Sequence, residues 1–135
     1  MNVRLIHTTL LTFIVILALA CDDPNRPDTG LSGVWEGTMK GYSQVSPNDT
    51  PLVLNLTQND RVLNGTISLP EAGRVHAIEN GNLDEFFIRL SFTSSGLITS
   101  YNGTLKGNSL EGTWRLSQGQ ETLETGSWQV TRAPR

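Results

Sequence analysis

Hydrophobic and polar positions alternate along most of the chain after residue 30. A period of two is typical of a β-strand with one buried and one solvent-facing side. No stretch of this region carries apolar residues at the i, i+3, i+4, i+7 spacing of an amphipathic helix over three turns. The alternation predicts about eight strands, at residues 33–42, 51–58, 62–69, 75–83, 86–92, 97–105, 110–116 and 126–132.

Short polar or glycine-containing segments separate these strands, at residues 59–60, 73, 94–96, 107–108 and 119. Turns of this length join neighbouring strands antiparallel. Eight antiparallel strands in a chain of this size close most simply into a barrel, which leaves no exposed sheet edge. The predicted fold is therefore all-β, with a single eight-stranded antiparallel up-and-down barrel. An open β-sandwich is the alternative.

A short motif, any residue followed by Gly and then Thr or Ser, recurs within the predicted barrel. Its glycines are Gly37, Gly65, Gly103, Gly112 and Gly126. Asn-Gly is typical of a hairpin turn, but a turn at Gly65 would leave only a stub of chain after the turn at residues 59–60. We therefore place all five glycines within strands, on the inner face beside bulky residues. There they allow the sharp coiling of a small barrel and make room for neighbouring rings, or they leave a lumen open for a ligand.

The first 20 residues have the pattern of an export signal. Arg4 supplies a positive charge, and residues 10–20 are apolar except for Thr12. Since crossing a bilayer takes about 20 apolar residues, this run is too short for a transmembrane helix. It matches the apolar region of a secretory signal peptide.

The only cysteine of the chain, Cys21, directly follows this segment and its small residues Ala18 and Ala20. The arrangement resembles the lipobox of bacterial lipoproteins. The resemblance implies that the Cys21 thiol is acylated, with palmitate among the expected groups. It also implies that the protein is held on a bacterial membrane in the cell envelope, facing the periplasm or the cell surface. An ordinary signal peptide followed by a chance cysteine is the alternative.

Residues 21–30 are acidic, contain two prolines and carry no apolar side chain after the cysteine. Such a segment cannot bury anything and is expected to stay extended. The chain thus divides into a lipoprotein signal peptide (1–20), a lipid-anchored flexible tether (21–30) and a β-barrel domain (31–135).

Composition narrows the range of functions. The chain has 135 residues and a formal net charge of −3, which argues against a nucleic-acid partner because a basic stripe is absent. One cysteine excludes an internal disulfide framework and a cysteine-cluster zinc site. No catalytic signature is present, and His76 has no metal-ligand partner at a recognisable spacing. We predict that the protein is not an enzyme and has no cofactor or metal.

Gly33-Val34-Trp35 at the start of the first strand resembles the G-x-W signature of lipocalins and related calycin barrels, a group that includes avidins. The resemblance implies an eight-stranded barrel with a binding cavity at one end. It also implies that an arginine of the last strand stacks on the tryptophan of the first. Arg132 is the candidate, because it shares its strand face with Trp128. By the same resemblance, residues 42–50 would rim the cavity.

The leading functional hypothesis is binding of a small, largely apolar ligand inside the barrel. An eight-stranded barrel is wide enough to be filled by side chains or to hold one small ligand. The alternative is a packed barrel that acts through its surface or rim, as an inhibitor of an exported envelope protein or as an accessory subunit to one. The predicted ligand-binding residues are Trp35, Met39, Tyr42, Leu54, Leu63, Phe86, Tyr101, Trp114 and Trp128.

Overall fold

The computed structural model of the chain describes residues 30–41 and 49–134. The expectations about the signal peptide, Cys21, the tether up to residue 29 and Tyr42 lie outside the described residues.

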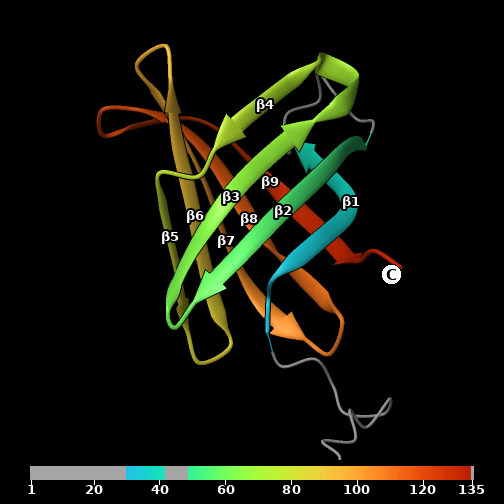
Figure 1. The fold of residues 1–135 in the computed structure, drawn as a ribbon. Coiled ribbons are helices and arrows are strands. Elements are labelled where there is room, and N and C mark those ends of the chain that lie inside the picture. Colours follow the sequence, from blue (N-terminus) through green and yellow to red (C-terminus); the bar gives the residue numbers. More distant parts are fainter. Residues whose placement is uncertain (1–29, 42–48, 135) are drawn as a thin grey trace, which may run out of the picture.

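The described chain consists of β-strands and one short 3₁₀ helix. All strand pairs are antiparallel, and the order β2-β1-β9-β8-β7-β6-β5-β3-β4 is closed by the pairing of β2 with β3 (Figure 1). The predicted closed all-β barrel is confirmed. Its elements are β1 (Gly33–Gly41), β2 (Thr50–Asn59), β3 (Val62–Leu69), η1 (Pro70–Ala72), β4 (Arg74–Ala77), β5 (Asn80–Asp84), β6 (Phe87–Ser94), β7 (Leu97–Lys106), β8 (Ser109–Gln118) and β9 (Glu121–Arg132).

The strand expected at residues 75–83 is divided in two. β4 pairs with the second half of β3, where Thr66 lies opposite Ala77 and Leu69 lies opposite Arg74. β5 pairs with β3 only where Val62 lies opposite Asn82. β5 continues the sheet to β6, and β4 pairs with β3 alone among the described strands. The molecule is thus an eight-stranded barrel with one extra strand.

The turn between β5 and β6 also differs from expectation. Phe86 was expected to open a strand and face inward, but Glu85 and Phe86 form the turn itself, and the strand begins at Phe87. Glu85 adopts φ 55°, as tight turns require. The Phe86 side chain is 63% exposed, so the inward placement was wrong.

Alternate turns of an up-and-down barrel lie at the same end. The turns β2–β3, β5–β6 and β7–β8 lie beside the start of β1 and the end of β9, and we name this the closed end (Figure 1). The end of β1, the start of β2, η1 and the turns β6–β7 and β8–β9 lie at the other end, which we name the open end.

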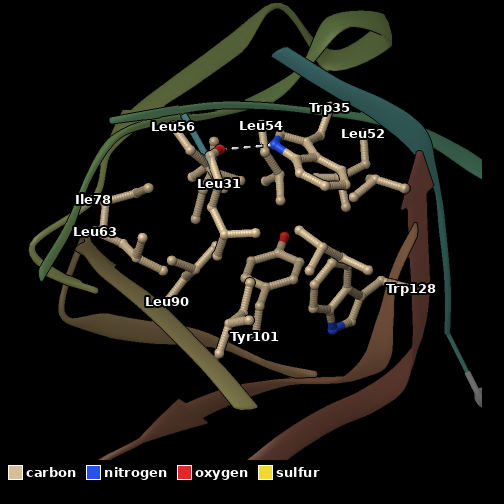
Figure 2. Close-up of a cluster of buried hydrophobic side chains, with 14 of the residues drawn as sticks. Leu31, Trp35, Leu52, Leu54, Leu56, Leu63, Ile78, Leu90, Tyr101 and Trp128 are labelled. Atoms are coloured by element: carbon tan, nitrogen blue, oxygen red, sulfur yellow. Dashed lines mark hydrogen bonds between the residues drawn. The ribbon is translucent and has the colours of Figure 1, made fainter. Parts of the chain in front are cut away.

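The inner face forms one hydrophobic cluster, part of which Figure 2 shows. Leu31 precedes β1, and its fully buried side chain lies among the strand residues. The alternation of the strands could not indicate this position. The buried members are Leu31, Trp35, Leu52, Leu54, Leu56, Leu63, Ile67, Ile78, Ile88, Leu90, Phe92, Tyr101, Leu110, Trp114, Trp128 and Val130.

Two cross-strand rows fill the middle of the barrel with tryptophan rings. In the first, Trp128 of β9 pairs with Gly112 of β8, which pairs with Gly103 of β7. A Cβ atom at Gly103 would lie 2.6 Å from the Trp128 ring. The indole Nε1 donates to the carbonyl oxygens of Thr113 at 3.0 Å and Asn102 at 3.3 Å. The ring therefore occupies space that side chains would otherwise take.

The second row repeats this arrangement in the opposite direction. Trp114 of β8 pairs with Gly126 of β9, which pairs with Gly41 of β1. A Cβ atom at Gly126 would overlap the Trp114 indole, whose Nε1 donates to the Lys40 carbonyl oxygen at 3.0 Å. The five motif glycines all lie within strands, as predicted. At Gly103 and Gly126 they make room for rings rather than leaving a lumen.

Candidate ligand site at the open end of the barrel

The closed end is sealed by hydrogen bonds around Leu31. The Trp35 indole donates to the Leu31 carbonyl oxygen at 2.9 Å (Figure 2), and the Leu31 amide donates to Gln58 Oε1 at 2.7 Å. The Gln58 amide donates to Ser32 Oγ at 2.9 Å. Arg132 Nη1 donates to the Ser32 carbonyl oxygen at 3.1 Å, and its guanidinium carbon lies 4.4 Å from the centre of the Trp35 ring. The stacking of Arg132 on Trp35 expected from the sequence is present.

Several residues expected to contact a ligand belong to this sealed part. Trp35, Leu54 and Leu63 have no exposed surface, and Trp128 is 2% exposed. None of these four side chains lines the open-end pocket described next. Phe86 lies on the closed-end turn, outside the barrel interior. Its expected role in the cavity is therefore wrong.

The open end holds a pocket of about 400 Å³. Three of the expected ligand-binding residues, Met39, Tyr101 and Trp114, line it together with residues from most of the other strands. The complete lining is Met39, Leu69, Arg74, His76, Phe92, Ser94, Ser95, Leu97, Thr99, Tyr101, Trp114, Leu116 and Glu124.

Tyr101 forms the floor of the pocket. Its side chain is 1% exposed and packs edge-on against the Trp128 ring, with 5.8 Å between ring centres. The hydroxyl contacts Met39 Sδ at 3.5 Å, and thioether sulfur is a weak acceptor. Burial raises the pKa of Tyr101 well above its ordinary value, so the group stays a protonated hydrogen-bond donor.

One wall of the pocket is made by two stacked rings. His76 of β4 and Phe92 of β6 lie parallel, with 4.0 Å between ring centres and 7° between planes. No backbone pairing joins β4 to β6 in the described part of the chain. Side-chain stacking therefore closes the barrel wall here, where the strand ladder is interrupted.

Apolar and aromatic side chains form much of the pocket wall. The polar groups of the lining are the Arg74 guanidinium, the His76 imidazole, the hydroxyls of Ser94, Ser95, Thr99 and Tyr101, and the Glu124 carboxylate. A mostly apolar cavity with a few polar groups is the usual composition of a small-molecule site. The arrangement is suited to holding a small molecule by ring contacts and orienting it by hydrogen bonds.

Other hollows of about 500 Å³ lie outside the barrel and are lined mainly by the solvent-facing sides of strands. One of them is bordered by Thr38, Glu111 and Gln129. Their polar surfaces are hydrated in the free protein, so they offer less desolvation gain than the open-end pocket.

Within the described residues, no group of three His, Cys, Asp or Glu side chains is arranged to hold a metal ion. No helix in that same part of the chain is long and apolar enough to cross a membrane.

Sequence reasoning missed most of the residues that line the pocket. Leu69, Phe92, Leu97 and Leu116 lie on the apolar sides of the predicted strands, but alternation alone does not single them out as site residues. The signal that could have found them is connectivity. Alternate turns share an end, so inner-face residues next to the turns of one end must surround the same opening. Arg74 and His76 carried no such signal, because β4 was not distinguished from β5.

A scan against protein-family models gives no match, and a search of curated proteins gives no match. Among solved structures, the chain is similar to apo Bradavidin2 (Form B), with 18% sequence identity and a TM-score of 0.46. The alignment covers 73% of this chain and 96% of that chain.

Proposed function

We propose that the protein binds a small ligand in the open-end pocket. The observation that carries this proposal is the contrast between a sealed closed end and a cavity of about 400 Å³ at the open end. Ligand pockets commonly have volumes of about 300–1,000 Å³ and apolar walls with a few polar groups. The proposed site occupies only the open end, whereas the sequence predicted a site along the whole barrel interior. The difference arises because tryptophan rings fill the middle of the barrel.

Binding is favoured over catalysis by the state of the titratable side chains. Burial raises the pKa of Tyr101, so its hydroxyl stays protonated at neutral pH and does not serve as a general base. The His76 ring is stacked on Phe92 at 4.0 Å rather than placed beside a nucleophile.

Tryptophan fluorescence tests this proposal, because Trp114 lines the pocket. The mature chain carrying Cys21→Ser would be titrated with fatty acids, retinoids and biotin-like compounds. We expect quenching or a spectral shift with at least one class. Thr99→Phe fills the pocket and should abolish the change, whereas Thr113→Phe, on the exposed side of β8, should leave it intact.

The opposite result favours the alternative function. No spectral change with any class, together with specific capture of an exported protein, would mean that the barrel acts through its rim or surface. The protein would then be an inhibitor or an accessory subunit.

We further propose that a lipid on Cys21 anchors the protein to a bacterial envelope membrane. The support is the signal-like segment 1–20, the position of Cys21 and the polar segment that follows. Each buried CH₂ of an acyl chain contributes about 0.8 kcal/mol to membrane affinity. Since the described chain begins at the closed end, this anchor leaves the open end free to receive a ligand.

Membrane fractionation tests the anchor separately. Cys21→Ser should move the protein from the membrane fraction to the soluble fraction, whereas the control Ser32→Ala should remain in the membrane fraction. Retention of Cys21→Ser in the membrane would show that the lipobox interpretation is wrong.

A further inference from the structure

We propose that the open-end pocket is suited to a small, planar aromatic anion, and that Arg74 holds its negative charge. This inference rests on the proposed ligand-binding function and names the chemical class of the ligand.

The first step is the charge of the rim. Arg74 lines the pocket, and within the described residues its guanidinium has no hydrogen bond or ion pair. Glu124 is the acidic residue of the lining, and it already takes part in another interaction. The cation is thus available to an anionic ligand, and arginine binds carboxylates through two parallel hydrogen bonds.

The second step is the shape of the walls. The parallel rings of His76 and Phe92 present a flat wall, and Tyr101 provides the floor. The Trp114 N–H is already bonded to the Lys40 carbonyl oxygen, so the indole offers the pocket mainly its carbon atoms. Aromatic rings pack on one another by stacking and by edge contacts, which a planar ligand ring can also make.

The third step is the hydroxyl at the floor. The Tyr101 hydroxyl is buried and contacts a thioether sulfur at 3.5 Å. Buried donors usually have a strong acceptor, so an oxygen atom at the inner end of a ligand would improve the hydrogen bonding of this group. The preferred ligand therefore has an acidic group toward the rim and an oxygen substituent at the opposite end of its ring.

Calorimetric titration with three matched naphthalenes tests the charge. The mature chain carrying Cys21→Ser would be titrated with 2-naphthoate, 2-naphthylmethanol and 2-naphthylmethylammonium, which share a ring and differ in charge. A hydrogen bond to a charged group contributes enough to change affinity by about tenfold. We therefore expect the carboxylate to bind about tenfold tighter than the alcohol, and the ammonium to bind most weakly.

Variants of Arg74 assign this preference to one side chain. Arg74→Gln should lower the affinity for 2-naphthoate by about tenfold and leave 2-naphthylmethanol within about twofold. Arg74→Lys should restore part of the affinity, since it keeps the charge but loses the paired donors. Arg115→Gln is the matched control, because Arg115 is exposed on the outer side of β8. It should change none of the three affinities.

A second pair of ligands tests the floor. 6-Hydroxy-2-naphthoate should bind more tightly than 2-naphthoate to the unchanged protein. In Tyr101→Phe the two should bind equally, because the hydroxyl donor is gone.

The outcomes separate this inference from the function on which it rests. If all three naphthalenes bind with equal affinity and Thr99→Phe blocks them, the pocket binds ligands but the inference about an anion is wrong. Unchanged binding of 2-naphthoate to Arg74→Gln overturns the role of Arg74. If neither the naphthalenes nor the fatty acids, retinoids and biotin-like compounds bind, the proposed function itself fails.

Discussion

The two ends of this barrel are built from the same strands but are completed differently. At the closed end, Leu31 enters from outside the sheet, and Trp35, Gln58 and Arg132 bond the chain around it. At the open end, the described residues surround a pocket of about 400 Å³, and Tyr101 lies where the packed core meets it. Alternation thus makes the barrel wall, whereas an end is closed only where a segment crosses it and its backbone polar groups find partners.

Two arginines, Arg132 at the closed end and Arg74 at the open end, show the same contrast. Arg132 lies over the Trp35 ring and donates to the Ser32 carbonyl oxygen. Arg74 lines the pocket without a partner among the described residues. One cation supports the fold, and the other is available to a ligand. The following variants are ordered from the largest to the smallest expected effect on this comparison.

Trp35→Ala should be the most damaging substitution, since it removes a fully buried ring and the hydrogen bond to Leu31 at the closed end. We expect the free energy of unfolding to fall by about 4 kcal/mol. Leu116→Ala at the half-buried open-end position should cost about 1–2 kcal/mol, because much of that side chain faces the pocket. Urea denaturation measures both. Equal losses would contradict the tighter packing of the closed end.

Gly112→Ala tests the rows that separate the two ends. A Cβ atom here would overlap the Asn102 carbonyl oxygen and lie 2.5 Å from Gly103 Cα. Overpacking against backbone should cost about 3 kcal/mol and disturb the neighbouring Trp128 ring. Gly30→Ala is the control, because nothing lies within 4 Å of a Cβ atom there. Urea denaturation and near-ultraviolet circular dichroism report the two effects, and a fully stable Gly112→Ala would refute this account of the row.

Arg132→Met and Arg74→Met compare the two arginines directly. Loss of the Trp35 stacking and of the bond to Ser32 should lower the free energy of unfolding by about 1–2 kcal/mol. Arg74→Met should change stability by less than about 0.5 kcal/mol, because the side chain is exposed. Thermal unfolding at low and high salt checks both values. The comparison fails if Arg74→Met is the more destabilising change.

Tyr101→Phe should have a smaller effect at pH 7 than Arg132→Met, about 1 kcal/mol or less, since the lost partner is a sulfur atom. The difference should grow in alkali. The pKa of Tyr101 is raised in the folded state, so above a pH of about 10 the unfolded chain ionises first and the folded state loses stability. The tyrosine protein should therefore lose about 1.4 kcal/mol per pH unit more than Tyr101→Phe in that range. Parallel alkaline curves for the two proteins would contradict burial of the hydroxyl.

Most strands could be predicted because each has one solvent-facing and one buried side, and this difference produces a hydrophobic pattern with a period of two. The hairpin turns at residues 60–61, 95–96, 107–108 and 119–120 were predicted to within about one residue, since glycine and polar residues are typical of tight turns. The region at 75–83 was less clear because β4 and β5 lie beside different partners. The Val75 side chain is 68% exposed, so the alternation weakens there.

The candidate site was less predictable than the fold. Parity identified Met39, Tyr101 and Trp114 as inward-facing residues, and all three line the pocket. The alternation of inward and outward positions does not show how far along the barrel axis a residue lies. It therefore grouped these three residues with Leu54 and Leu63, which lie in the sealed core. Phe86 was misplaced because a one-residue shift at a turn changes a residue from inner face to loop.

The sequence by itself determined the all-β class, the antiparallel order of strands, the glycines within the strands and the candidate pair Trp35 and Arg132. These features follow from local alternation, turn chemistry and parity, which are properties of short segments. Only the tertiary structure decided which end of the barrel is filled by side chains and that Leu31 enters the core. It also decided that β5 rather than β4 pairs with β6, and that Arg74 and His76 line a pocket. Those outcomes depend on closure of the sheet, which brings together residues far apart in the chain and fixes how much space their side chains fill.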